Sequence, residues 1–446
     1  MKQRLFLLPL LALLSLILIP DTAAAQKKKT DNKENGQEKV VYVDDESCGC
    51  ELVFIDGIQT IERNGKFGFK REDGTVFVEP IYKFVDKFHG DYCIVYYDYD
   101  SCGLIDRNGR TIVPVHYQEV NYPTDGMIRV RKGDYYGFYD TAGHQVIDFH
   151  YRTASGFSEG LAVVIIDFDS NTIGYGYINK QDSLAISAKY EYAYAFSEGY
   201  AIVKQYDRFG MIDHNGREVL TIKYLEVTPM LYGHFFAVEE ISEKAALFDN
   251  HFKRLTPFIY EKIQSYGEGF YTVMRDGKYT YLDFKGKERF GFYDIAAPFY
   301  EGYAMVSRDR KYGIINDRGK VILPIEYDNS GYRSMEYVFA ENLAMVEKDG
   351  HYGFINKSGK IVIPLIYKST QHCTEGLIPV QKDGAWGYID KEGNAVSDFV
   401  FDIASFFEYG RAEVVYQGTV YKINPDGVCV KNCKTYPKNI KFKFKN

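Results

Sequence analysis

Apolar and polar residues alternate along most of the chain in short runs of about five to seven residues. One such run places four apolar residues on the same face: Val321, Leu323, Ile325 and Tyr327. Its other face carries Pro324 and Glu326. A period of two is the pattern of a β-strand with one buried face. Because no long stretch beyond the N-terminal segment has helical spacing, the pattern predicts an all-β protein.

The alternating runs belong to a repeat of about 35 residues, marked by an aromatic-Gly-hydrophobic triplet. Seven copies centre on Gly68, Gly137, Gly176, Gly210, Gly313, Gly353 and Gly387. Cys102-Gly103-Leu104 is a variant, and Ala246, Thr280 and Tyr421 replace the glycine in three more units. These positions are mostly 33 to 36 residues apart, with two longer steps of 39 and 40. The spacing predicts about eleven copies.

Turn residues divide each copy into three antiparallel strands. Asp or Asn follows the triplet glycine by three residues and a second Gly by six, as in Asn316 and Gly319, which is typical of a type I turn. Asp349-Gly350 before the next triplet is typical of a type I′ hairpin. We expect strands over residues 343–347, 352–356 and 360–367, then a Phe-Ser-Glu-Gly loop. Pro80, Pro114, Pro324 and Pro364 recur in the third strand, which must be an edge or bent there. The triplet glycine leaves a bare surface for a ring or lets two strands approach closely.

The 40 Tyr and 31 Phe are the most unusual feature of the composition. Aromatics favour strands, and Tyr can bury its ring while its hydroxyl stays in water. We expect most of them to be core residues. Two groups in the loops are candidates for an exposed ligand or partner surface, because insertions in a repeat array often map to the binding face. They are Tyr96, Tyr97 and Tyr99 in one repeat, and Tyr332 and Tyr337 in another.

The N-terminus has the pattern of a secretory signal peptide. Lys2 and Arg4 precede an apolar run from Leu5 to Ile19, and Ala23-Ala24-Ala25 offers a cleavage site. The run is shorter than the roughly 20 residues of a spanning helix. We expect a signal peptide over 1–25, a disordered linker over 26–50, the repeat array over 51–428 and a tail over 429–446 that caps the array edge. The protein is then exported and periplasmic, cell-surface or secreted.

Export permits disulfides among the seven cysteines. Cys93 and Cys102 flank a hairpin tip and could pair across two strands. Cys429 and Cys433 could close the last repeat onto the tail. Cys373 stands alone within the array.

No motif predicts catalysis, a metal or a cofactor. Gly156-Phe157-Ser158-Glu159-Gly160 spells a nucleophile elbow, but it is one copy of the repeated loop and no helix follows. No Cys or His spacing is that of a zinc site. The net charge of −7 disfavours nucleic-acid binding, which needs clustered Lys and Arg.

The repeat resembles the WG-repeat family, named for a Trp-Gly pair. The closest copy is Trp386-Gly387-Tyr388-Ile389-Asp390-Lys391-Glu392-Gly393, and the resemblance covers roughly residues 53–428. It implies a bacterial β-repeat protein with no catalytic residues to carry over. Only Trp386 keeps the tryptophan. Because eleven units exceed the 4 to 8 blades of an ordinary propeller, we expect an open superhelical array, with a closed ring as the alternative.

Three functions follow as hypotheses. The first is a non-enzymatic scaffold that binds a partner protein at the bacterial envelope or exterior. The second is a glycan-binding module, because sugars stack on aromatic faces while carboxylates and amides bond their hydroxyls. The third, an enzyme of unrecognised type, has no supporting motif.

Overall fold

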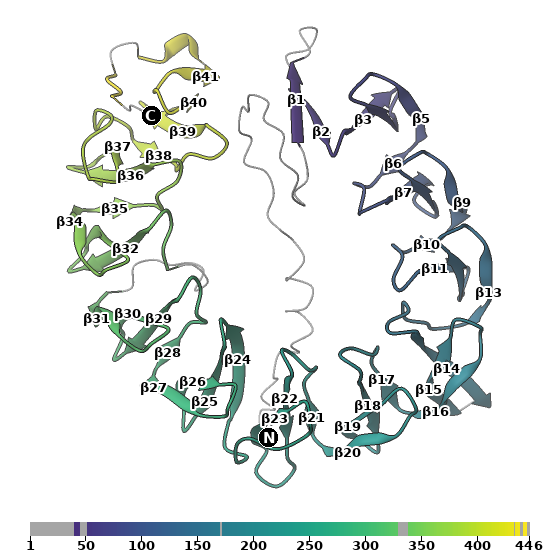
Figure 1. The fold of residues 1–446 in the computed structure, drawn as a ribbon. Helices are drawn as coiled ribbons and strands as arrows, with labels where there is room; N and C mark the ends of the chain where they lie inside the picture. The colour runs from purple at the N-terminus through teal and green to yellow at the C-terminus, as the bar shows by residue number, and fades with distance from the viewer. Residues whose placement is uncertain are drawn as a thin grey trace. The chain divides into compact units, whose positions relative to one another are not determined.

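A computed structural model describes residues 40–44, 51–169, 172–328, 338–431, 433–437 and 440–443. These residues form eleven small antiparallel sheets of three to five strands, and one short 3-10 helix (Figure 1). The prediction of a tandem all-β repeat is therefore confirmed. The chain divides into an N-terminal unit, residues 29–243 and 247–254, and a C-terminal unit, residues 244–246 and 255–446.

The N-terminal unit holds six sheets, in which strands pair in sequence order. The first three contain β1 (Val40–Asp44), β2 (Glu51–Ile55), β3 (Ile58–Arg63), β4 (Lys66–Arg71) and β5 (Val76–Tyr82); β6 (Phe84–Val85), β7 (Tyr92–Asp98), β8 (Ser101–Asp106) and β9 (Thr111–Tyr117); β10 (Glu119–Val120), β11 (Met127–Lys132), β12 (Tyr135–Asp140) and β13 (Gln145–Tyr151). The next three contain β14 (Leu161–Asp169), β15 (Thr172–Asn179) and β16 (Leu184–Tyr190); β17 (Tyr192–Ala193), β18 (Ala201–Gln205), β19 (Arg208–Ile212) and β20 (Glu218–Tyr224); β21 (Glu226–Val227), β22 (His234–Val238) and β23 (Ala245–Asp249), which crosses the unit boundary.

The C-terminal unit holds five sheets of the same design. They contain β24 (Lys262–Gly267), β25 (Phe270–Arg275), β26 (Lys278–Asp283) and β27 (Glu288–Tyr293); β28 (Ile295–Ala296), β29 (Tyr303–Arg308), β30 (Lys311–Asn316) and β31 (Val321–Tyr327); β32 (Leu343–Lys348), β33 (His351–Asn356) and β34 (Ile361–Tyr367); β35 (Ser369–Thr370), β36 (Leu377–Lys382) and β37 (Ala385–Asp390); β38 (Ile403–Ala404), β39 (Ala412–Tyr416), β40 (Thr419–Ile423) and β41 (Cys429–Lys431). The 3-10 helix η1 spans Cys433–Thr435.

The predicted three-stranded unit is confirmed almost to the residue in β32, β33 and β34. The hairpin between the first two turns at Asp349 and Gly350, whose φ angles of 53° and 69° are those of a type I′ turn. The next turn is held by Asn356, whose Oδ1 accepts from the amides of Ser358 at 3.0 Å and Lys360 at 3.1 Å. The repeated Asp and Asn residues are thus turn residues, as their spacing predicts.

The third strand lies so close to the triplet glycine that a side chain has no room there. Tyr352 pairs with Tyr367 and Phe354 with Ile363, so three residues of β34 lie opposite Gly353 in an irregular bulge that contains Pro364. A Cβ at Gly353 would stand 2.6 Å from the carbonyl oxygen of Ile363. Of the two predicted reasons for this glycine, close strand approach is the one observed.

The core lies between consecutive sheets. Leu343 and Phe354 of one sheet pack with Ile378 and Ile389 of the next, all at most 7% exposed. Nine tyrosines end the third strand of a repeat or occupy the matching position, and eight of them are buried: Tyr82, Tyr117, Tyr151, Tyr190, Tyr224, Tyr260, Tyr293 and Tyr367. The apolar face predicted for β31 is wrong at Val321. The bulge turns this side chain outward and leaves it 53% exposed.

The two ends of the described chain differ from the predicted segments in detail. The predicted signal peptide, 1–25, lies outside the described residues, and β1 falls within the predicted linker, 26–50. In the predicted tail, Phe442 pairs with Ser397, and the amide of Lys443 donates to the carbonyl of Val396 at 2.7 Å. The tail therefore adds backbone pairing to the sheet that contains β37. No helix in the described ranges is both long and apolar enough to cross a bilayer.

Candidate functional site

The β7–β8 hairpin is irregular at the tyrosines that the sequence singles out. Tyr96 pairs with Cys102 and Asp98 with Ser101, so Tyr97 is an extra residue in a β-bulge. The corresponding β11–β12 hairpin pairs without interruption from Met127 to Lys132. A bulge turns a side chain out of the regular alternation, and here it presents Tyr97 to solvent.

Tyr97 and Tyr99 form an exposed aromatic surface with residues that end the preceding repeat. Tyr97 is 44% exposed and stacks on buried Tyr82, with ring centroids 5.3 Å apart. Tyr99 is 76% exposed and lies 5.3 Å from the ring of Phe84. The ammonium of Lys83 stands 4.2 Å from the centre of the Tyr99 ring. We call these residues the Tyr97–Tyr99 surface: Tyr82, Lys83, Phe84, Tyr97 and Tyr99.

The remaining predicted site tyrosines do not join this surface. Tyr96 differs from the prediction because it is half-buried and packs against the core cluster around Ile94 and Leu104. Burial, followed by the charges of Asp86 and the two cysteines nearby, raises the pKa of the Tyr96 phenol. Tyr332 and Tyr337 lie outside the described residues.

The Tyr97–Tyr99 surface has the chemistry of recognition. Its ring faces can contact apolar groups or C–H bonds, and Lys83 adds a positive charge. Asp98 and Asp100 are exposed beside it, with the Asp98 carboxylate accepting from the Asp100 amide at 2.9 Å. Ser101, opposite Asp98 in the hairpin, donates its hydroxyl to the Val115 carbonyl at 3.2 Å.

The predicted Cys93–Cys102 disulfide is wrong, because both residues are buried free thiols. Cys93 pairs with Ile105, and Cys102 pairs with Tyr96, which is three residues after Cys93 in β7. Because successive side chains of a strand alternate between faces, the two cysteines point to opposite faces of the sheet. Cys93 packs in the core with Phe69, whereas Cys102 packs with Tyr117. Burial, followed by the charge of Asp86, raises the pKa of the Cys93 thiol to about 12. Cys373 is also a buried free thiol.

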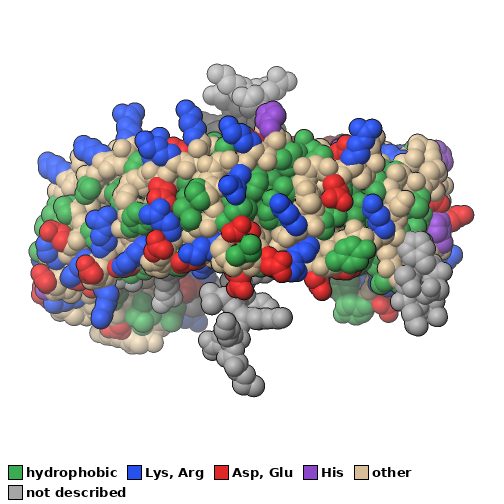
Figure 2. All heavy atoms as spheres, turned by 90° about the horizontal axis from the view of Figure 1, so that it is seen from below, with side chains coloured by type: hydrophobic (Ala, Val, Ile, Leu, Met, Phe, Trp, Pro, Cys, Tyr) green, Lys and Arg blue, Asp and Glu red, His purple; other side chains and the backbone are tan. Residues whose placement is uncertain are grey.

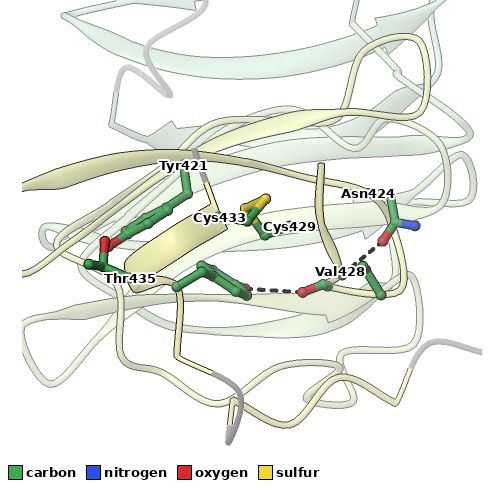
Figure 3. Close-up of a disulfide and its surroundings, with 8 residues drawn as sticks. Tyr421, Asn424, Val428, Cys429, Cys433 and Thr435 are labelled. Carbon is green, nitrogen blue, oxygen red and sulfur yellow. Dashed lines mark hydrogen bonds between the residues drawn. A yellow bond between two sulfur atoms is a disulfide. The ribbon is translucent and has the colours of Figure 1, made fainter. Parts of the chain in front are cut away.

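The predicted link between Cys429 and Cys433 is present as a disulfide (Figure 3). It joins β41 to η1. Nearby, the hydroxyls of Tyr421 in β40 and Thr435 in η1 share a hydrogen bond of 2.8 Å, which ties the neighbouring strand to the same helix. This pair therefore fastens the last repeat to the tail.

Acidic residues in the loops between repeats form a series of bonds that the sequence reasoning missed. Each lies at positive φ before the first strand of a repeat, and its carboxylate accepts from the amide of the equivalent glycine one repeat later. The bonds are Asp125 to Gly160 (2.6 Å), Glu159 to Gly199 (3.0 Å), Glu268 to Gly302 (2.6 Å), Glu341 to Gly376 (3.1 Å) and Glu375 to Gly410 (2.9 Å). We call this series the turn ladder.

Basic residues from the Asx turn of the following repeat contact three acids of the turn ladder, Asp125, Glu159 and Glu341, and two further loop acids, Asp56 and Glu301. The ion pairs are Asp56–Arg107 (3.2 Å), Asp125–Lys180 (3.0 Å), Glu301–Lys357 (2.8 Å) and Glu341–Lys391 (3.2 Å), and the His214 imidazole lies 3.1 Å from the Glu159 carboxylate. In these five pairs, a basic residue comes directly after the Asx residue and 50 to 56 positions after the acid, and this spacing was the signal in the sequence. The Phe-Ser-Glu-Gly loop is therefore a joint between repeats.

Ser158 has a structural partner within this joint. Its hydroxyl donates to the carbonyl oxygen of Phe196 at 2.7 Å, one repeat later. Within the described ranges, no three His, Cys, Asp or Glu side chains gather as a metal site. On the face in Figure 2, Lys and Arg are mixed with Asp and Glu, and hydrophobic side chains lie among them.

Comparisons with known proteins place the repeat in a described class. The family model "WG containing repeat" matches seven segments: 103–136, 136–167, 175–208, 247–279, 312–351, 352–384 and 386–419. No curated protein matches the sequence.

Solved structures resemble the chain only loosely. One is a crystal structure of the eukaryotic initiation factor, with 11% identity and a TM-score of 0.37, covering 67% of this chain and 90% of that chain. BamB from Moraxella catarrhalis has 9% identity and a TM-score of 0.28, over 56% and 86%. The extracellular domain of BT3049, assigned to a hybrid two component system of B. thetaiotaomicron, has 9% identity and a TM-score of 0.24, over 88% and 64%. Scores this low support no functional conclusion.

Proposed function

Because the chain belongs to the WG containing repeat family, we propose that it is a non-catalytic scaffold that binds a partner protein through the Tyr97–Tyr99 surface. The observation that carries this proposal is the Tyr99 ring, 76% exposed, with the Phe84 ring 5.3 Å and the Lys83 ammonium 4.2 Å from its centre. Aromatic residues are enriched at the centres of protein interfaces because they bury much area with little loss of side-chain entropy. The bulge that exposes Tyr97 is absent from the β11–β12 hairpin, so the turn does not require it.

The test is a photo-crosslinking amino acid placed at position 99 of the full chain in its native cells. We expect a defined protein adduct at position 99 and none at position 206. Tyr206 is the matched control, because it is 81% exposed at another hairpin tip. With the captured protein purified, Tyr99→Ala should weaken binding by about tenfold, as for an interface hot spot, and Tyr206→Ala should not. Equal adducts at both positions would contradict the proposal.

Export is part of the same proposal and is supported by the signal-peptide pattern of residues 1–25. Mass spectrometry of the mature protein is expected to find Gln26 as the first residue, in the periplasmic, surface or secreted fraction. A full-length chain in the cytoplasm would exclude an exported scaffold.

A glycan is the second candidate ligand, favoured by the exposed Tyr99 face beside the Asp98 and Asp100 carboxylates. Titration with purified wall or surface polysaccharide distinguishes it from the protein partner. Saturable binding that is lost in both Tyr99→Ala and Asp98→Asn would support the glycan. A turnover activity abolished by a single Ser, Asp or His substitution would instead overturn both binding proposals.

A further inference from the structure

One joint of the C-terminal unit shows how this fold binds a lysine side chain. The Lys357 ammonium lies 2.8 Å from the Glu301 carboxylate. It also lies 5.9 Å from the centre of the Tyr303 ring and 6.0 Å from that of Phe339. The two rings are edge to face, with centroids 4.8 Å apart. The ammonium is therefore bound by a carboxylate beside two aromatic rings.

The preceding joint has the same parts but no lysine. Its acid is Glu268, which lies at positive φ two residues before Phe270. Phe270 and Phe299 take the places of the two rings, with centroids 5.1 Å apart. Asp317 directly follows the Asx residue of its turn, as Lys357 does in the next repeat. An acid therefore occupies the position from which the other joint receives its base.

Backbone contacts with one glycine bring the two carboxylates together. The Gly302 amide donates to the Glu268 carboxylate at 2.6 Å, and the Gly302 carbonyl accepts from the Asp317 amide at 2.9 Å. A Cβ at Gly302 would lie 4.0 Å from the carboxyl carbon of Asp317. Carboxylates that share a site repel each other, and a bound cation relieves that repulsion.

The same two carboxylates line a pocket of about 440 Å³ together with three phenylalanine rings. The rings are those of Phe270, Phe284 and Phe290, and the centroids of Phe270 and Phe290 are 5.2 Å apart. A volume of this size is typical of a site for a small ligand or a side chain. Apolar walls beside carboxylates suit a chain of methylene groups that ends in a cation. We call these residues the Glu268–Asp317 pocket: Glu268, Phe270, Phe284, Phe290 and Asp317.

The basic residues of the pocket do not replace the missing lysine. Arg289 is already paired, because its guanidinium donates to the Asp283 carboxylate at 2.8 Å. Lys285 and Arg318 also line the pocket, and both are exposed. Over the residues that the structure describes, neither of them forms an ion pair with a carboxylate of the pocket.

We propose that the Glu268–Asp317 pocket binds a lysine side chain of a partner protein, as Glu301 binds Lys357 within the chain. A lysine has a flexible stem of four carbons, which the phenylalanine rings can contact while the ammonium reaches the carboxylates. The pocket belongs to the C-terminal unit and the Tyr97–Tyr99 surface to the N-terminal unit. Either proposal can therefore fail while the other stands.

The experiment titrates the full-length protein with the blocked tripeptide acetyl-Gly-Lys-Gly-amide, followed by ligand-observed NMR. The same peptide with an acetylated lysine side chain keeps the methylene groups and removes the charge. We expect saturable binding of the lysine peptide and at least about fivefold weaker binding of the acetylated peptide. Absent binding of the lysine peptide, or equal binding of the two, would overturn the proposal.

Two variants and a matched control locate the binding. Asp317→Lys supplies the missing base from within the chain and should weaken the peptide by about tenfold or more, because the new lysine competes at high effective concentration. Glu268→Gln keeps an acceptor for the Gly302 amide, removes the charge and should weaken the peptide by about fivefold. Asp134→Lys makes the same charge change as Asp317→Lys at an exposed hairpin tip and should change nothing.

Thermal melting shows whether the variants are folded. Asp317→Lys should melt at or above the temperature of the wild type, because it replaces two neighbouring carboxylates by an ion pair. Unchanged peptide affinity in a folded Asp317→Lys protein would show that the lysine peptide does not bind in this pocket.

Discussion

The glycine of each triplet is the residue on which the repeat depends most directly. At Gly353, the bulged third strand lies so close that a methyl group would meet the Ile363 carbonyl oxygen and the Leu365 amide nitrogen at 2.6 and 2.9 Å. Both are backbone atoms, which cannot rotate away as a side chain can. Gly103 and Gly313 stand in the same relation to Val113 and Leu323. The repetition of this glycine therefore reflects packing space.

Gly353→Ala is expected to lower the free energy of unfolding by about 2–4 kcal/mol, the range for severe overpacking. Gly350→Ala is the matched control, because a Cβ there meets no atom within 4 Å. Its φ of 69° should make that change cost about 1 kcal/mol. Urea denaturation followed by circular dichroism measures both. Similar losses in the two variants would show that close approach is not the reason for Gly353.

At the scale of the structural element, the joint between repeats consists of a carboxylate, a backbone amide and a basic side chain. Asp125 illustrates it with bonds to Gly160 and Lys180. Each ion pair is partly exposed, so each contributes little alone. Because the arrangement recurs from loop to loop, it holds successive repeats in register.

The pH dependence of stability tests this joint. The hydrogen bond from Lys180, followed by that from the Gly160 amide, lowers the pKa of the Asp125 carboxyl in the folded state. Its stabilisation is therefore complete above the unfolded pKa of about 3.9 and is lost as the pH falls through the lower folded value. We expect Asp125→Asn to reduce the melting temperature at pH 7 but not at pH 2.

Asp134→Asn is the control for this comparison, because Asp134 is an exposed residue at a hairpin tip. Its melting temperature should follow the wild type at both pH values. A deficit in Asp125→Asn of the same size at pH 2 and pH 7 would show that the negative charge is not what stabilises the joint.

The terminal element depends on the Cys429–Cys433 disulfide. The bridge closes a loop with a sequence separation of 4, for which chain entropy predicts about 2 kcal/mol. We expect Cys429→Ser with Cys433→Ser to speed hydrogen exchange at the amides of Asp398 and Lys443, which bond the tail to the array. Amides of β11, in the N-terminal unit, serve as the internal control. Unchanged exchange at Asp398 would show that the tail holds without the bridge.

At the scale of the whole molecule, buried tyrosines limit the pH range of the fold. Tyr177, Tyr281 and Tyr388 are fully buried, and their hydroxyls donate to the carbonyls of Tyr194, Ala297 and Ser405 at 2.6 to 2.8 Å. Burial raises the pKa of each phenol well above its usual value of about 10. The same position is occupied by tyrosine in repeats of both units.

We expect the protein to unfold cooperatively in alkali. Because the folded pKa values are raised, the stability is complete below about pH 10 and is lost as the pH rises beyond the unfolded pKa. Phenolate absorbance should show exposed tyrosines titrating first and a second step that coincides with the loss of circular dichroism. Tyr388→Phe should reduce the amplitude of the second step. Complete ionisation with an unchanged dichroism spectrum would contradict this expectation.

Much of the architecture could be predicted from local sequence. Period-two runs, Asp-Gly hairpins and Asx turns each act within a few residues, so they identified β32 to β34 and the number of repeats. Tyr97 and Tyr99 could be proposed as exposed because they stand in a dense tyrosine run at a hairpin. Their local sequence does not distinguish Tyr96 from them. The bulge that exposes Tyr97 and leaves Tyr96 half-buried depends on strand register.

The repeat, its turns and the identity of its core positions can be read along the chain, because they follow from the chemistry of neighbouring residues. The faces that the cysteines take, and the points where carboxylates meet amides one repeat away, came from the folded structure. These depend on register and on contacts between residues about 35 to 55 positions apart. Such contacts form when sheets stack, and they leave no local signature along the chain.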